Sequence, residues 1–401
     1  MRSKEKNNGK VDLTRAKFLI EGVEIFGREG FWNISGEDGK IALIQKTNNS
    51  GGGIITPRFS DIHIHLDKTG TSGRIARRAT SLFDAISLMD KDKDNWTEED
   101  IYCRANEALE DAWHYGTGSL RTHIDWETQE VPLAWEILNE LKSQWKGRLD
   151  IELAALCSLE LLEQHGEKIA KTLKADNSVL GSFVYRNSQT EKKLKQVFEI
   201  AKKWGLLLDF HVDEGLEEGA AGIDIIIELA KAAGMQRKVL CGHACSLSIR
   251  NEAEVSEILK KAAEAQVGLV TLPTTNLWLQ DNLENRTPRF RGLAPIKEAR
   301  EAGVLVMIAS DNCKDAFYPF GDHDVLSVFK TAVVAAHLNE KKWFDSITTT
   351  PAEWMGIRNK IEEGEDATFL RFDLNSIFEL MNSQSQKYDV WNKGNIISVC
   401  K

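Results

Sequence analysis

The chain has 401 residues, of which 42% are hydrophobic and 28% charged, and its formal net charge is -10. This length exceeds that of a usual single domain, so we expect one large domain with a smaller satellite. The acidic balance, the lack of a concentrated basic face and the lack of a long apolar window argue against nucleic acid and membranes as partners.

The amino terminus and the cysteines indicate the cellular compartment. Residues 1–10 are charged and lack the apolar stretch of a secretory signal. The six cysteines are scattered without a CxxC pair, which is typical of free thiols in a reducing compartment. We therefore expect a cytoplasmic protein.

Short apolar runs at both ends of the chain predict a small β domain, because turn-forming Gly, Asp and Asn separate them. These runs are Lys17–Ile20, Ile41–Gln45, Asp366–Phe372 and Gly394–Val399. We expect residues 1–57 and 359–401 to pair into one β-sandwich domain.

Between residues 58 and 358, short apolar strands alternate with longer segments of helical period, which is typical of βα units and a parallel sheet. The eight expected strands are Asp61–Leu66, Ser119–Asp125, Asp150–Leu156, Val179–Val184, Leu206–Val212, Lys238–Cys241, Val267–Leu272 and Val304–Ala309. Eight units over this length predict an α/β fold, a (β/α)8 TIM barrel with its active site at the carboxyl ends of the strands.

Metal-binding residue types gather at these strand ends. His63 and His65 end the first strand, and side chains at i and i+2 of a strand point to the same face. Such a pair alone is more often a core or surface feature. Here, however, His211 ends the fifth strand, His243 the sixth and Asp311 the eighth. Neutral imidazoles with a carboxylate suit zinc or a ferrous ion, so we predict a metal site.

Glu214 lies three residues beyond His211 and is a candidate general acid/base. A glutamate after a strand more often begins a helix, where the helix dipole favours its charge. Beside a predicted metal site, the catalytic role is the better interpretation.

These motifs resemble the amidohydrolase superfamily, most closely its cytosine deaminase branch and the isopropylammelide amidohydrolase of triazine breakdown. The resemblance runs from about Lys17 to the end. The matching stretches are His63-Ile64-His65-Leu66-Asp67-Lys68, Arg121-Thr122-His123-Ile124-Asp125, His211-Val212-Asp213-Glu214, and Ser310-Asp311-Asn312 followed by Tyr318-Pro319-Phe320-Gly321.

The resemblance implies one divalent metal, zinc or iron with manganese also accepted, and four ligands: His63, His65, His211 and Asp311. Such a metal lowers the pKa of a bound water toward ~7, so that hydroxide is available at neutral pH. The resemblance further implies that Asp311 takes the proton of this water and that Glu214 protonates the ring nitrogen. His243 would orient the hydroxide and stabilise the tetrahedral intermediate.

Two departures from the cytosine deaminases concern the substrate. Ser158 stands where those enzymes have a glutamine, and Asn312 stands where they have a second aspartate. Both changes alter the polar pattern that the pocket presents to a ring. The full set of expected substrate contacts is Lys68, His123, Ser158, Asn276, Trp278, Asn312 and Phe317. A structural role is an equally good interpretation for His123, and core packing is an alternative for Trp278 and Phe317.

We therefore expect a hydrolytic deaminase of an amino-substituted heterocycle, such as a pyrimidine, triazine or pterin-like ring. Removal of an alkylamine from an s-triazine is an alternative with the same chemistry. Hydrolysis of a cyclic amide is a second alternative. Enzymes of that kind usually hold two metals on a strand-four lysine, which Val179–Val184 lacks. A non-catalytic barrel would have lost a ligand or the acid/base, and all are present. The native metal and a homo-oligomeric state stay open.

Overall fold

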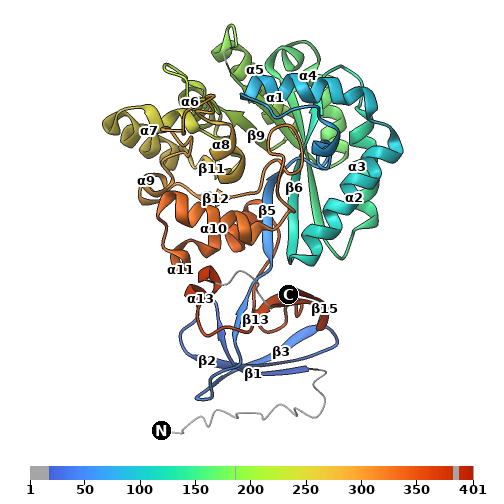
Figure 1. Ribbon diagram of the computed structural model, residues 1–401, viewed down its shortest axis with the longest axis vertical. Helices are drawn as coiled ribbons and strands as arrows, with labels where there is room; N and C mark the ends of the chain where they lie inside the picture. Colours follow the sequence, from blue (N-terminus) through green and yellow to red (C-terminus); the bar gives the residue numbers. More distant parts are fainter. Residues whose placement is uncertain (1–17, 186, 383–387, 401) are drawn as a thin grey trace, which may run out of the picture. The chain divides into compact units, whose positions relative to one another are not determined.

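The computed structural model describes residues 18–185, 187–382 and 388–400 (Figure 1). The charged amino terminus, with Lys17, lies outside these residues. The chain forms two compact units. One comprises residues 59–358, and the other combines residues 1–58 with residues 359–401.

The larger unit contains an eight-stranded sheet in the order β12-β11-β10-β9-β8-β7-β6-β5, with parallel neighbours throughout. Its strands are β5 (Phe59–Ile64), β6 (Thr117–Trp126), β7 (Asp150–Ser158), β8 (Val179–Val184), β9 (Leu208–Val212), β10 (Val239–His243), β11 (Gly268–Thr271) and β12 (Val306–Ile308). The predicted (β/α)8 barrel is confirmed.

The barrel closes between its first and last strands. The backbone N–H of Asp311 donates a hydrogen bond to the carbonyl of His63 at 2.8 Å, and Ile64 forms a parallel bridge with Asp311. The backbone N–H of Ser310 donates to Oδ1 of the buried Asp61 at 3.0 Å, and the Ser310 hydroxyl donates to the other carboxylate oxygen. Closure therefore places two predicted metal ligands next to each other.

Helices pack around the barrel sheet (Figure 1). In α4, buried Leu162, Ile169 and Leu173 recur at helical spacing and form its apolar face. The Ser158 hydroxyl caps this helix by accepting a hydrogen bond from the Leu161 N–H at 3.0 Å. The helices are α1 (Leu82–Asp92), α2 (Glu98–His114), α3 (Leu133–Gln144), α4 (Leu159–Ala175), α5 (Thr190–Trp204), α6 (Gly222–Ala233), α7 (Glu252–Ala265), α8 (Pro273–Leu279), α9 (Ile296–Glu301), α10 (Val325–Ala336), α11 (Glu340–Trp343) and α12 (Thr349–Trp354), with the 3-10 turns η2 (Ser72–Arg74), η3 (Lys93–Asn95), η4 (Cys245–Ile249) and η5 (Phe344–Ile347).

The two chain ends form the second sheet, in the order β15-β14-β13-β4-β1-β2-β3. Its elements are β1 (Phe18–Ile25), β2 (Phe31–Glu37), β3 (Lys40–Thr47), β4 (Ile54–Thr56), β13 (Phe369–Phe372), β14 (Tyr388–Asn392) and β15 (Asn395–Cys400), with the helix α13 (Ile377–Asn382). Ile34, Ile55, Phe369 and Trp391 belong to its apolar core. The predicted small β domain from both ends is confirmed. Its seven strands are hydrogen-bonded into one sheet, and Phe18 of β1 packs against Trp391 of β14, which is not a neighbouring strand.

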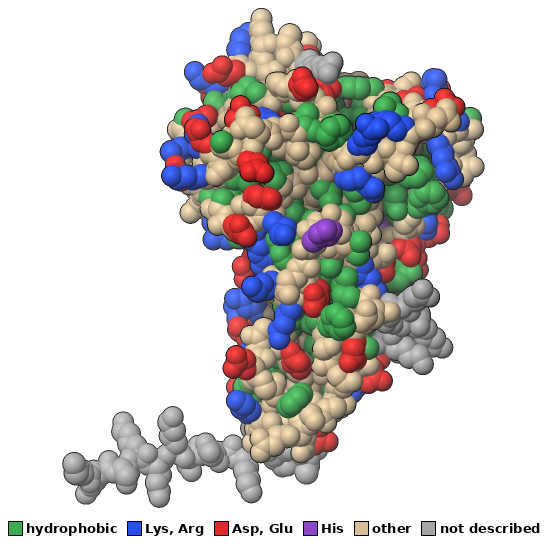
Figure 2. Space-filling model, turned by 60° about the vertical axis from the view of Figure 1, so that its left-hand side comes forward, with side chains coloured by type: hydrophobic (Ala, Val, Ile, Leu, Met, Phe, Trp, Pro, Cys, Tyr) green, Lys and Arg blue, Asp and Glu red, His purple; other side chains and the backbone are tan. Residues whose placement is uncertain are grey.

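The surface view shows how charge is distributed. On the face drawn in Figure 2, acidic and basic side chains are interspersed, and neither sign covers that face continuously. Within the described ranges, no helix combines the length and the apolar character that crossing a lipid bilayer requires.

The barrel interior contains a buried ion cluster. Nη1 of Arg121 in β6 donates to Oδ2 of Asp209 in β9 at 2.6 Å, and its Nε donates to Glu152 of β7 at 2.7 Å. The side chains of Arg121 and Asp209 have no exposed area. Burial raises the pKa of Asp209 to about 6, although the neighbouring Arg121 guanidinium opposes this shift. The cluster therefore places Asp209 in an environment that penalises an unpaired charge.

Arg121→Ala is expected to destabilise the protein by about 3–5 kcal/mol, because Asp209 would remain buried without its cation. Lys203→Ala is the matched control, since Lys203 and Glu167 form a pair whose side chains are 63% and 53% exposed. Its cost should be much smaller, because water already solvates both partners. Urea unfolding followed by circular dichroism measures both changes. Equal losses of unfolding free energy in the two variants would show that burial does not raise the cost of breaking the ion pair.

Candidate active site

Four side chains from three strand ends converge. His63 lies in β5 and His65 directly after it, while His211 lies in β9 and Asp311 follows β12. Nε2 of His211 is 3.1 Å from Nε2 of His63 and 3.2 Å from Nε2 of His65. Nε2 of His65 is 3.2 Å from Oδ1 of Asp311. Ligands of a tetrahedral metal at ~2.0–2.1 Å lie roughly 3.4 Å apart, so these donor atoms have nearly the spacing of a coordination shell.

The protonation states of these side chains also fit a metal. Burial, with the neighbouring histidines, lowers the pKa of His63 and of His211 well below the usual value. Neutral imidazole is the form that binds a metal. Oδ2 of Asp311 and Nε2 of His243 are buried and find no hydrogen-bond partner among the described residues. Because buried polar atoms are normally satisfied, this His/Asp cluster is able to bind a divalent cation.

The backbone at the strand ends is unusual. Asp213, His243 and Asp311 have φ values of 49°, 70° and 63°. A positive φ is uncommon for residues other than glycine, although Asp and His tolerate it better than most. Such conformations cluster at functional sites, where the surrounding structure enforces them. The barrel rim therefore holds these three side chains in directions that an extended strand would not give.

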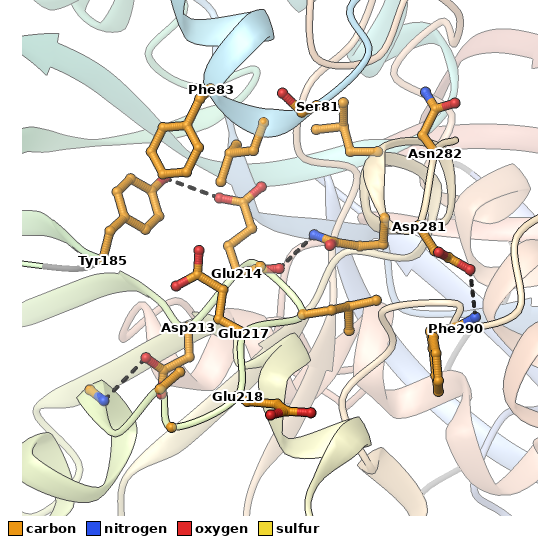
Figure 3. Close-up of a pocket in the computed structure, with 18 of the residues that line it drawn as sticks. Ser81, Phe83, Tyr185, Asp213, Glu214, Glu217, Glu218, Asp281, Asn282 and Phe290 are labelled. Carbon is orange, nitrogen blue, oxygen red and sulfur yellow. Dashed lines mark hydrogen bonds between the residues drawn. The ribbon is translucent and has the colours of Figure 1, made fainter. Parts of the chain in front are cut away.

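Glu214 lies beside the cluster in a hydrogen-bonded position. Its Oε1 is 3.7 Å from Nδ1 of His243, and its Oε2 accepts a hydrogen bond from the Tyr185 hydroxyl at 3.2 Å (Figure 3). The side-chain amide of Gln280 donates to its backbone carbonyl at 2.5 Å. Burial, with the nearby Asp311 carboxylate, raises the pKa of Glu214 to about 8. A carboxyl group that exchanges its proton near neutral pH is suited to general acid/base catalysis.

A cavity of about 420 Å³ adjoins these side chains. The sequence-predicted residues that line it are His65, Lys68, Ser158, His211, Glu214, His243, Asp311, Asn312 and Phe317. Asn276 lies outside the lining, with its Nδ2 3.1 Å from Nδ1 of His243. His123 packs behind the cavity, with its ring centroid 4.1 Å from that of His63. Trp278 does not line the cavity, although it packs against the same apolar cluster as Tyr185 and Phe317, which do line it.

Lys68 is a buried cation in the lining. Its Nζ is 2.7 Å from Oδ1 of Asp125 and 3.4 Å from Oδ2 of Asp67. Burial lowers the pKa of Lys68, but these two carboxylates outweigh burial and raise the pKa above its usual value. Lys93 also contacts Asp125, at 3.1 Å. Lys68 therefore stays charged and brings hydrogen-bond donors to the cavity wall.

Sequence reasoning missed an aromatic wall in this cavity. Phe183 and Tyr185 stack with ring centroids 5.4 Å apart, and Phe83 meets Tyr185 edge-on at 5.9 Å. Phe83, Phe183, Tyr185 and Trp126 all line the cavity. The sequence pattern that could have predicted this wall is the spacing of Phe183 and Tyr185, because residues two apart at a strand end share a face. Such rings are typical walls for a flat ligand.

Comparison with known proteins shows the family to which the chain belongs. A sequence model of the amidohydrolase family matches residues 155–396. The pterin deaminase of Rhizobium rhizogenes is 30% identical, over 86% of this chain and 80% of that protein. The N-isopropylammelide isopropyl amidohydrolase of Pseudomonas sp. is 24% identical, over 86% of each chain. The resemblance that the motifs indicate is confirmed.

Solved structures show the same fold. The 5-methylcytosine deaminase from Klebsiella pneumoniae superposes with a TM-score of 0.84 at 22% identity, covering 95% of this chain and 97% of that one. The N-isopropylammelide isopropylaminohydrolase from Burkholderia multivorans superposes with a TM-score of 0.81 at 22% identity, covering 95% and 98%. At this identity the likeness concerns the fold.

His63→Ala is expected to weaken metal binding by more than about 100-fold, because it removes one converging nitrogen from a site whose remaining donors are prepositioned. His114→Ala, an exposed histidine at the end of α2, is the control and should keep its metal. Elemental analysis after dialysis against a graded chelator measures both variants. Equal metal content in the two would refute the ligand assignment.

Proposed function

The chain belongs to the amidohydrolase family, and from this premise we propose that it is a metal-dependent deaminase of an amino-substituted nitrogen heterocycle. Its class, a hydrolase of C–N bonds other than peptide bonds, follows from the family and its relatives. The observation that carries the proposal is the buried Glu214 carboxyl, with its raised pKa, beside the His/Asp cluster in one cavity.

We assign the metal to four ligands: His63, His65, His211 and Asp311. Zinc or iron, with manganese also accepted, would supply a Lewis acid that makes a water nucleophilic at neutral pH. β8 contains no lysine that could be carboxylated to hold a second ion, so a single metal is proposed.

Three side chains would manage the protons. Asp311, whose Oδ2 is buried without a partner, would accept the proton of the attacking water. Glu214 would donate its proton to a ring nitrogen and then assist the departing amine. Burial lowers the pKa of His243 to about 4, so this ring is neutral. With Asn276 donating to Nδ1, Nε2 of His243 would carry the ring proton and would stabilise the developing oxyanion.

The cavity offers a defined polar pattern for the ring. The Ser158 hydroxyl already accepts a hydrogen bond from the Leu161 N–H, which leaves it free to donate. Asn312 already donates from Nδ2 to Asp315 at 2.7 Å, which leaves its carbonyl oxygen as an acceptor. Lys68 adds a charged donor. A pterin-like ring, which carries an amino group beside ring nitrogens and a carbonyl, is our first choice, supported by the 30% identity with a pterin deaminase.

Removal of an alkylamine from an s-triazine is the second candidate. It is supported by the relatives named isopropylammelide hydrolases, in sequence and in fold. The same residues would perform the same attack, and only the leaving group differs. The apolar wall of Phe83 and Tyr185 would suit an alkylamine.

Ammonia release by metal-loaded protein is the test of the proposal. We expect pterin to be deaminated faster than aminopyrimidines, aminotriazines and guanine in the same assay, because the aromatic wall suits a bicyclic ring. Alkylamine release from N-alkylammelides, followed by chromatography, distinguishes the second candidate. If no member of the panel loses an amine while the metal is bound, deamination is the wrong assignment.

Glu214→Gln should retain the metal and lower kcat/KM by about 100-fold to 10,000-fold, since the amide cannot shuttle a proton. Glu301→Gln, at an exposed position at the end of α9, is the matched control and should keep full activity. Steady-state kinetics with metal analysis measures both. Full activity in Glu214→Gln would show that Glu214 is not the proton shuttle.

A further inference from the structure

A second, larger cavity adjoins the catalytic one. Its volume is about 770 Å³, and it shares Phe83, Tyr185 and Glu214 with the smaller cavity of about 420 Å³. Figure 3 shows these three residues on one side of the larger cavity and Asp281 and Phe290 on the other. The two cavities therefore meet at these three side chains, and a substituent on a ring bound beside Glu214 would reach the larger one there. The volume exceeds what the ring itself needs.

The walls of the second cavity are partly apolar and open to solvent. Phe83, Leu283 and Phe290 all line it and are 55%, 57% and 56% exposed. Large apolar side chains left exposed around one cavity indicate a surface that becomes covered when a ligand binds. Covering them would release free energy in proportion to the apolar area removed from water.

The charge of the lining selects against anions. Glu217, Glu218 and Asp281 contribute carboxyl groups, and the described lining residues include no lysine or arginine. Backbone N–H groups of Arg289 and Phe290 donate to Asp281 and lower its pKa to about 2, so it is ionised at neutral pH, and Arg286 forms an ion pair with it. Glu217 and Glu218 therefore supply the negative charge of the lining. Glu217 and Glu218 would repel a negatively charged group bound beside them, whereas a neutral or cationic group would not be repelled.

We propose that the natural substrate is a heterocycle bearing a bulky, largely apolar or aromatic substituent without negative charge, and that the second cavity binds this substituent. The inference rests on the proposed function, because it places the reacting ring beside Glu214. It assigns substrate selection to Leu283, Phe290 and Glu218, which come from loops beyond the catalytic residues.

Three matched compounds test the proposal: pterin, its 6-anilinomethyl derivative, and the same derivative with a para-carboxylate on the phenyl ring. We expect kcat/KM for the neutral derivative to exceed that for pterin by about tenfold. The carboxylated derivative should fall about threefold to tenfold below the neutral one, because its para-carboxylate brings a negative charge close to Glu217 and Glu218.

Two variants connect these differences to the cavity. Phe290→Ala should reduce the preference for the neutral derivative over pterin by about tenfold, whereas Phe378→Ala should preserve it. Phe378 is 62% exposed and does not line either cavity. Glu218→Lys should raise the ratio of kcat/KM for the carboxylated to the neutral derivative by about fivefold, and the exposed control Glu301→Lys should leave that ratio unchanged.

The outcomes separate this inference from the proposed function. If pterin is deaminated but the three compounds react equally and neither cavity variant changes their ratios, the second cavity does not bind the substituent, and the deaminase assignment stands. If none of the three compounds is deaminated by metal-loaded protein, the proposed function fails for pterins, and the inference is overturned with it.

Discussion

The site depends on the backbone hydrogen bond from the Asp311 N–H to the His63 carbonyl, which closes the barrel. These residues lie near opposite ends of the barrel unit in sequence, and nothing local connects them. Because all strands of a parallel barrel end at one rim, closure brings the last strand beside the first. The carboxylate of Asp311 therefore reaches the imidazoles, and β9 supplies His211 from across the barrel. Without closure, the donor atoms would be scattered.

The site is maintained against local backbone preference. His243 and Asp311 have positive φ values, and several buried polar atoms have no partner within the described chain. Such features persist only where many contacts from the surrounding structure hold the backbone and the side chains in place. Here the surrounding structure includes apolar strands and the buried pair of Arg121 and Asp209, which joins β6 to β9. The same low-dielectric interior that makes an unpaired charge costly also raises the pKa of Glu214.

Structural hydrogen bonds limit what the cavity can recognise. Ser158 caps α4, and Asn312 holds Asp315, so each has part of its hydrogen-bonding capacity already used. A side chain that caps a helix keeps a fixed direction, which makes its remaining donor more selective. Specificity at such a site therefore follows from which lone pairs and protons the fold leaves free.

The amino-acid sequence by itself determined the barrel, the small β domain from both ends and the positions of the metal-binding residue types. These follow from backbone periodicity, since spacing such as that of His63 and His65 specifies a face wherever the strand lies. The tertiary structure decided which side chains meet. Phe83 from α1 joins Tyr185 in the cavity wall, while Trp278, which the sequence predicted for that wall, packs against the same apolar cluster as Tyr185 without lining the cavity. Local patterns do not encode the paths of long loops, so the cavities that these loops line appear only when the chain is folded.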